Sequence, residues 1–208
     1  MRVLARYMVL SMLSGLVACA TDRAPTTADA SLDALTQREP SAQRQRAMRR
    51  LQLATAYFEQ GQHEVAKREV RAAIDLDPQY AQSFNLLGLI HQRLQSPSLA
   101  QQSFDQALNL AATDEPAEQA SIQHNYGWWL CEQAQYTQGQ AMLQRALAQP
   151  GYRQAVNTWL VLGDCQQRAG QLLQARQSWQ HALSLEPHNP WLKQRLSSPE
   201  MQKSIPSS

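Results

Sequence analysis

The sequence predicts an all-α protein, a right-handed α-solenoid of about four helix pairs that ends in a short C-terminal capping helix. Three observations lead to this prediction. Ala, Leu, Gln, Arg and Glu dominate residues 46–196, and these residue types favour helices. Val, Ile and Thr do not alternate with polar residues, so no strand is indicated. Small residues also recur at fixed offsets in four successive frames, a pattern typical of stacked repeats.

The first element in the chain is an apolar block of 12 residues, 7–18, preceded by two arginines. A bilayer-spanning helix needs about 20 apolar residues, so this block fits the h-region of a signal peptide over residues 1–18. The block ends in Leu-Val-Ala-Cys and resembles a bacterial lipobox, which implies cleavage before Cys19 and acylation of that residue. The alternative is a buried helix with a stray thiol. Ala20, rather than Asp, follows the cysteine. Similarity to lipoproteins of Gram-negative bacteria then implies an outer-membrane location, on the periplasmic face.

Charge and motifs narrow the classes of function. Cleavage removes Arg2 and Arg6, which lowers Lys plus Arg from 19 to 17 and matches the 17 Asp plus Glu. A neutral chain lacks the basic surplus of a nucleic-acid binder. We find no nucleophile elbow, no phosphate-binding glycine loop and no His-Glu-x-x-His site. The sequence therefore predicts no enzyme, no cofactor, no metal site, no small-molecule substrate and no nucleic acid.

Two polar segments flank the helical domain. Residues 19–45 are rich in Ala, Thr, Ser, Asp and Pro, and we interpret them as a flexible tether that carries the lipidated Cys19. A flexible chain of about 25 residues spans roughly 25–30 Å between its ends. Residues 197–208 form a C-terminal tail without an apolar pattern. The domain between them, 46–196, would stand just off the membrane surface.

The domain divides into repeats that match the tetratricopeptide (TPR) pattern. Trp159, Leu162, Gly163, Ala175, Trp179, Ala182 and Pro187 show it in full apart from one position. The repeats cover approximately 47–80, 81–114, 120–153 and 156–189, with small insertions of which one falls in 111–119. Small residues at offsets 8, 20 and 27 would let two helices approach, and large residues at offsets 4, 7, 11 and 24 would fill the space around them.

Turn and cap residues agree with these repeats. Gly61 and Gly170 occupy offset 15 of their frames, where the chain turns between the two helices of a pair. Asn189 and Pro190 are typical of an N-cap and a first helical position, so they predict the start of the capping helix.

The repeat pattern also predicts a binding surface. In tetratricopeptide proteins the first helices of the pairs line a concave surface that binds peptides, with offsets 2, 5, 9, 12 and 13 facing it. We expect the partner-binding groove at Leu51, Thr55, Phe58, Asn85, Leu89, Gln92, Trp128 and Leu160. Alternatively, Phe58 and Trp128 pack inside the domain. A clamp for a terminal carboxylate would need Lys, Arg or Asn where this chain has Leu51, Thr55 and Leu86.

Cys131 and Cys165 lie at offsets 12 and 10 of adjacent first helices. Such helices pack side by side, and a periplasmic location permits a disulfide between them. Two separate buried thiols are the alternative, because free Cys behaves as a small hydrophobe.

The stretch NYGWWLC, residues 125–131, together with the lipobox and the four repeats, resembles the type IV pilus biogenesis/stability lipoproteins, the pilotins of the pilus secretin. Trp129 stands where many relatives would have Phe. The resemblance implies an outer-membrane lipoprotein that binds the type IV pilus secretin and promotes its localisation and multimerisation, in pilus (fimbrium) biogenesis and twitching motility. The alternatives are a TPR lipoprotein scaffold for peptidoglycan enzymes or outer-membrane protein assembly, and a periplasmic hydrolase.

Overall fold

The computed structural model describes residues 40–111 and 116–198. These residues belong to the second of two units into which the chain divides, Pro40–Ser208. The predicted signal peptide, the lipidation site Cys19 and most of the predicted tether lie outside the described residues, as does the tail after residue 198.

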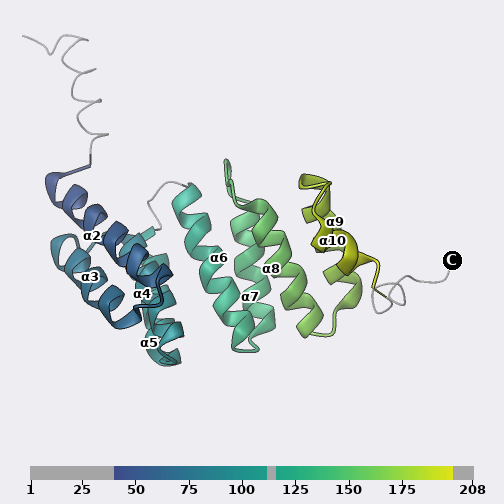
Figure 1. Ribbon diagram of the computed structural model, residues 1–208, viewed down its shortest axis with the longest axis horizontal. Coiled ribbons are helices and arrows are strands. Elements are labelled where there is room, and N and C mark those ends of the chain that lie inside the picture. The colour runs from purple at the N-terminus through teal and green to yellow at the C-terminus, as the bar shows by residue number, and fades with distance from the viewer. Residues whose placement is uncertain (1–39, 112–115, 199–208) are drawn as a thin grey trace, which may run out of the picture. The chain divides into compact units, whose positions relative to one another are not determined.

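The described part of the chain is all-helical and contains four consecutive helix pairs (Figure 1). The pairs are α2 (Ala42–Glu59) with α3 (His63–Leu76), α4 (Ala81–Arg93) with α5 (Pro97–Leu110), α6 (Pro116–Glu132) with α7 (Tyr136–Leu147), and α8 (Ala155–Arg168) with α9 (Leu172–Leu185). The first helices also pack on one another, α2 on α4, α4 on α6 and α6 on α8. This arrangement confirms the predicted α-solenoid.

The helix α10 (Pro190–Leu196) closes the described domain by packing on α9. The side chain of Asn189 accepts a hydrogen bond from the backbone N–H of Leu192 at 3.1 Å, and Pro190 occupies the first turn. Leu192 is fully buried against the last helix pair. The predicted cap and capping helix are therefore confirmed.

Within each pair, the residue at offset 8 of the first helix faces the residue at offset 24 of the second. The first is smallest where the second is largest. A Cβ atom added to Gly88 would lie 2.8 Å from the ring of Phe104, and one added to Gly163 would lie 2.3 Å from Nε1 of Trp179. The first repeat has Ala54 at the corresponding position, where the facing residue is only a valine. Glycine therefore occurs where the facing side chain is large, because the backbone itself forms the contact surface.

All four turns between paired helices contain a residue with positive φ. Gly61 and Gly170, predicted at these turns, have φ of 75° and 77°. Gln95 and Ala134 occupy the same offset with φ of 54° and 59°. The left-handed conformation costs a non-glycine residue about 1–2 kcal/mol. Packing of the two helices therefore imposes this turn even where the local sequence disfavours it.

Three details differ from the sequence-based boundaries and packing. Helix α2 begins at Ala42, before the expected domain start at 46, because Ser41 accepts a hydrogen bond from the backbone N–H of Arg44 and caps the helix. Helix α6 begins at Pro116, before the frame start near 120, so part of the insertion lengthens this helix. Leu53, expected to fill space inside the domain, is 40% exposed because no helix pair precedes α2 in the described domain.

Candidate partner-binding groove

The eight predicted groove residues all lie on first helices. Leu51, Thr55 and Phe58 lie on α2, Asn85, Leu89 and Gln92 on α4, Trp128 on α6 and Leu160 on α8. Seven of these side chains are partly exposed, whereas Asn85 is buried. Several of the partly exposed apolar residues also pack on the core: Leu51, Phe58 and Leu89 against the first two helix pairs, and Leu160 against the last.

Two of the predicted polar groove residues use their side chains inside the protein. Asn85 donates to the Oε1 atom of Gln82 at 3.0 Å and accepts from Nδ2 of Asn125 at 3.1 Å. Gln82 in turn donates to Oγ of Ser121 at 3.1 Å, so this chain of amides joins α4 to α6. The hydroxyl of Thr55 donates to the backbone carbonyl of its own helix at 2.9 Å. Asn85 therefore helps to join two first helices of the groove, whereas the hydroxyl of Thr55 is used within its own helix.

Most of the stretch NYGWWLC is core. Tyr126, Gly127, Trp129, Leu130 and Cys131 are buried. The ring of Tyr126 stacks on Phe104 with ring centroids 5.2 Å apart, and its hydroxyl donates to Asp105 at 2.8 Å. Only Asn125 and Trp128 of this stretch are partly exposed. Trp128 is therefore the one aromatic side chain of this stretch that a partner could contact.

Arg93 joins two of the predicted aromatic residues. Its guanidinium carbon lies 5.9 Å from the ring centroid of Phe58 on α2 and 5.5 Å from the ring of Trp128 on α6. These three side chains come from three consecutive first helices. Arg93 lies at offset 13, one of the groove-facing offsets, but it was not among the eight predicted residues because its position alone does not show that it lies over both rings.

A pocket of about 360 Å³ continues from Trp128 toward the C-terminal end of the described domain. Its lining includes Cys131 and Glu132 on α6, Asp164, Cys165 and Arg168 on α8, and Arg195 on α10. The repeat pattern does not predict this pocket, because α10 contributes to it from outside the four repeats.

Charges in this pocket are paired. Arg168 forms an ion pair with Glu132, and the guanidinium of Arg195 lies 2.9 Å from the Oδ1 atom of Asp164. Burial raises the pKa of Asp164, and the positive charge of Arg195 opposes that increase. The pocket therefore presents opposite charges in pairs and has no excess of either sign.

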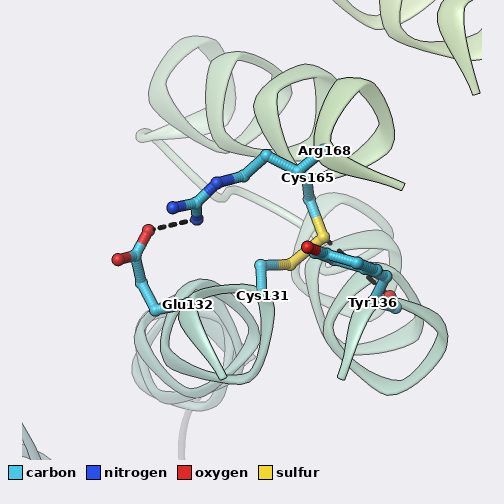
Figure 2. The surroundings of a disulfide bond; sticks show 5 residues. All are labelled: Cys131, Glu132, Tyr136, Cys165 and Arg168. Carbon is cyan, nitrogen blue, oxygen red and sulfur yellow. Dashed lines mark hydrogen bonds and ion pairs between the residues drawn. A yellow bond between two sulfur atoms is a disulfide. The ribbon is translucent and has the colours of Figure 1, made fainter. Parts of the chain in front are cut away.

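A disulfide lies beside the first of these ion pairs (Figure 2). Of the two alternatives for Cys131 and Cys165, the structure has the disulfide, with Cα atoms 5.5 Å apart and a sequence separation of 34. Figure 2 shows Glu132 and Arg168 pointing toward each other across the gap between α6 and α8, next to the sulfur atoms. The bond and the ion pair therefore join the same two first helices.

His124 links α6 to α8 farther along the same helices. Its Nδ1 atom lies 2.8 Å from Oγ1 of Thr158, which is fully buried and also contacts the hydroxyl of Tyr152 at 2.8 Å. Burial lowers the pKa of His124 to about 4. The neutral imidazole is therefore the form that the folded domain accommodates.

Acidification is expected to destabilise the domain through His124. The unfolded chain takes up a proton on this side chain near pH 6.5, whereas the folded chain does so only near pH 4, so stability falls as pH decreases between these values. The loss is about 2 kcal/mol between pH 7.5 and pH 5. Thermal unfolding of wild type and of His124→Gln at both pH values measures this difference, and a pH response as large in the variant as in wild type would contradict the assignment. Burial also lowers the pKa of His91, so the variant should retain a smaller response.

The described part of the chain contains neither a metal-ion cluster nor a membrane-spanning helix. No cluster of three or more His, Cys, Asp or Glu side chains in residues 40–111 and 116–198 is arranged to hold a metal ion. None of the helices in these same ranges combines the length and hydrophobicity needed to cross a bilayer.

Comparison with known proteins gives matches in sequence and in fold. Residues 50–80 and 81–114 match the family model of the tetratricopeptide repeat. The type IV pilus assembly protein PilF of Pseudomonas aeruginosa is 28% identical over 140 residues, which cover 67% of this chain and 54% of PilF. An uncharacterized protein of Haemophilus influenzae is 26% identical over 113 residues, which cover 54% of this chain and 60% of that protein. The chain thus spans only about half to three fifths of the length of these curated relatives.

Solved structures extend the likeness over most of the chain. A structure from a functional characterization of Pseudomonas aeruginosa PilF aligns with a TM-score of 0.68 and 24% identity, over 78% of this chain and 75% of that one. The crystal structure of PilW, described as a widely conserved type IV pilus biogenesis factor, aligns with a TM-score of 0.65 and 28% identity, over 72% and 66% of the two chains. The protein is therefore an α-solenoid with tetratricopeptide repeats, and it resembles proteins of type IV pilus biogenesis in sequence and fold.

Proposed function

We propose that this protein is a non-enzymatic type IV pilus biogenesis factor that binds the pilus secretin. The observation that carries this proposal is the match to PilF over 140 residues, together with the fold shared with PilW. Both relatives are described as pilus assembly or biogenesis factors. Their likeness covers the helical domain that carries the groove, so a protein-binding role in the same process is the function that these similarities support.

The groove supplies the binding surface in this proposal. Phe58, Arg93 and Trp128 form a partly exposed cluster across α2, α4 and α6, and the pocket beside Trp128 extends it to α8 and α10. Aromatic and arginine side chains are the residue types that most often dominate the affinity of protein interfaces. A segment of the secretin would lie along the first helices and insert side chains at these points.

The lipobox supplies the membrane anchor. Acyl chains on Cys19 would hold the protein at the periplasmic face of the outer membrane, and each buried CH₂ group contributes about 0.8 kcal/mol to that attachment. Binding of the secretin to an anchored protein raises the local concentration of secretin subunits at the membrane. The proposed consequence is outer-membrane localisation of the secretin and its assembly into multimers.

Substitution Cys19→Ala tests the anchoring step. Without acyl chains the protein should leave the membrane fraction, and secretin multimers in the outer membrane should fall at least several-fold. Immunoblots of membrane fractions from cells carrying the variant measure both quantities. The control is Arg145→Gln, which changes an exposed arginine on the second helix α7 and leaves the anchor and the first helices unaltered.

Two results, one from this test and one from purification of the native protein with its partners, would count against the proposal. Wild-type amounts of outer-membrane multimers in cells that hold only soluble Cys19→Ala protein would show that anchoring is not needed. Co-purification of the native lipoprotein with peptidoglycan enzymes or outer-membrane assembly proteins, and not with the secretin, would assign the groove to another partner.

A further inference from the structure

Arg93 carries an exposed positive charge that the described protein does not neutralise. Among residues 40–111 and 116–198, no carboxylate lies within ion-pairing distance of its guanidinium group. Arg168 and Arg195, on the same side of the first helices, are both ion-paired. Arg93 instead lies over the rings of Phe58 and Trp128.

The repeat pattern makes this lack of a carboxylate partner informative. Offset 13 holds Glu59, Arg93, Glu132 and Arg168 in the four repeats, so the charge alternates along the row. Arg168 is paired with Glu132, which occupies that carboxylate. No ion pair joins Arg93 to Glu59, although the two stand in the same relation along the chain. Of the two arginines at offset 13, Arg93 is therefore the one whose charge is available to a partner.

We propose that Arg93, Phe58 and Trp128 form a subsite for an Asp or Glu side chain in the partner segment, an inference that rests on the proposed function. The guanidinium lies over two rings, and these contacts reduce the conformational freedom that binding would remove. Contact of the guanidinium with the rings does not use its N–H groups as donors to oxygen, so they can donate to a carboxylate. The two rings supply apolar surface on either side of the charged contact.

The pocket beside Trp128 adds a second element to the motif. Its two arginines already face Glu132 and Asp164, so it has no unpaired cation for another carboxylate. An uncharged side chain of the partner fits its volume of about 360 Å³ without leaving a charge unpaired. The segment would therefore carry an acidic residue close to an uncharged one.

A terminal carboxylate is a poorer fit than an acidic side chain. The positions that bind a terminal carboxylate in clamp-type repeats hold Leu51, Thr55 and Leu86 here. Leu86 is buried, and the hydroxyl of Thr55 donates to its own helix. Arg93 offers a carboxylate a fork of N–H donors without a second cationic or amide partner at these positions, which suits a side-chain carboxylate within a segment.

Peptide binding to the full-length lipoprotein in detergent tests this subsite. The probes are overlapping 15-residue peptides, amidated at the C-terminus, that cover the pilus secretin of the same bacterium. In peptides that bind, replacing the acidic residue by its amide should weaken binding at least tenfold in fluorescence anisotropy. Arg93→Gln should weaken binding of the acidic peptide by a similar factor and leave binding of the amide peptide unchanged.

Two further variants sharpen this test. Arg145→Gln removes an exposed arginine from a second helix and should change neither affinity. Glu59→Gln removes a carboxylate that could compete for Arg93, so it should leave the affinity for the acidic peptide equal or higher. Thermal unfolding of Arg93→Gln within a few degrees of wild type shows that the variant is folded.

The outcomes separate this inference from the proposed function. Suppose that peptides bind, and that Arg93→Gln either weakens binding of the acidic and amide forms equally or changes neither affinity. The carboxylate subsite is then wrong, and the secretin remains the partner. If no peptide binds but intact secretin co-purifies, reduced recovery with Arg93→Gln and not with Arg145→Gln supports the subsite, and equal recovery overturns it. If the secretin neither co-purifies nor yields a binding peptide, the proposed function fails and the subsite fails with it.

Discussion

Reduction of the Cys131–Cys165 disulfide is expected to lower the free energy of unfolding of the domain by about 4 kcal/mol. The bond joins α6 to α8 and closes a loop with a sequence separation of 34. Closing a loop of this length restricts the unfolded chain far more than the folded one, in which the two Cα atoms already stand 5.5 Å apart. Thermal unfolding followed by circular dichroism, with and without a thiol reductant, should show a decrease in Tm of roughly 10 °C.

The control for this experiment is the double variant Cys131→Ala/Cys165→Ala. The Tm of this variant should be lower than that of unreduced wild type. It should not respond to the reductant, because no disulfide remains to be reduced. A thiol titration of denatured, unreduced wild type should find neither cysteine reactive. Two reactive thiols at these positions, or a wild-type Tm that stays constant after complete reduction, would contradict a stabilising disulfide.

Substitution Gly163→Ala is expected to destabilise the fourth helix pair by about 3 kcal/mol, in the upper range of overpacking costs. The new methyl group would lie 2.3 Å from Nε1 and 2.5 Å from Cδ1 of Trp179. Trp179 is fully buried, donates to the backbone carbonyl of Leu160 at 3.3 Å and has the guanidinium of Arg195 4.3 Å from its ring centroid. The ring has contacts on several sides, so it cannot move without breaking them. Chemical denaturation of wild type and variant measures the loss.

A double-mutant cycle with Trp179→Val identifies the cause of this loss. The first repeat has Ala54 and Val70 at the corresponding positions, both fully buried, so an alanine–valine pair fits this helix contact. Gly163→Ala should therefore cost less than about 1 kcal/mol in the Trp179→Val background, with the difference appearing as a coupling energy. Additive effects of the two changes would show that the Gly163–Trp179 contact does not determine the cost.

Local and repeating features of the fold were predictable from the sequence. Helix-forming composition and small residues at fixed offsets predicted the stacked pairs, and Asn189 with Pro190 predicted the start of α10. Such features depend on residues near one another in the chain or in the same repeat, and each repeat shows them again. The turns at Gln95 and Ala134 were not predictable from residue type, because their positive φ is imposed by the packing of the paired helices.

The candidate site was only partly predictable for a related reason. The repeat offsets placed the eight predicted residues on first helices. Offsets cannot tell which side chains will bond inside the protein, and Asn85 proved to be buried in a chain of amides between α4 and α6. They also cannot show that Arg93 lies between two rings, or that α10 brings Arg195 to the pocket beside Trp128.

The sequence by itself determined the class of fold and predicted a face on which a partner could bind, because both follow from a pattern repeated in each helix pair. Only the tertiary structure decided how that face is used. It joined Cys131 to Cys165, paired Arg168 with Glu132 and left Arg93 without a carboxylate in the described domain. Each of these outcomes depends on distances of a few ångströms between side chains more than 30 residues apart, which the packing of neighbouring first helices sets and a linear pattern does not contain.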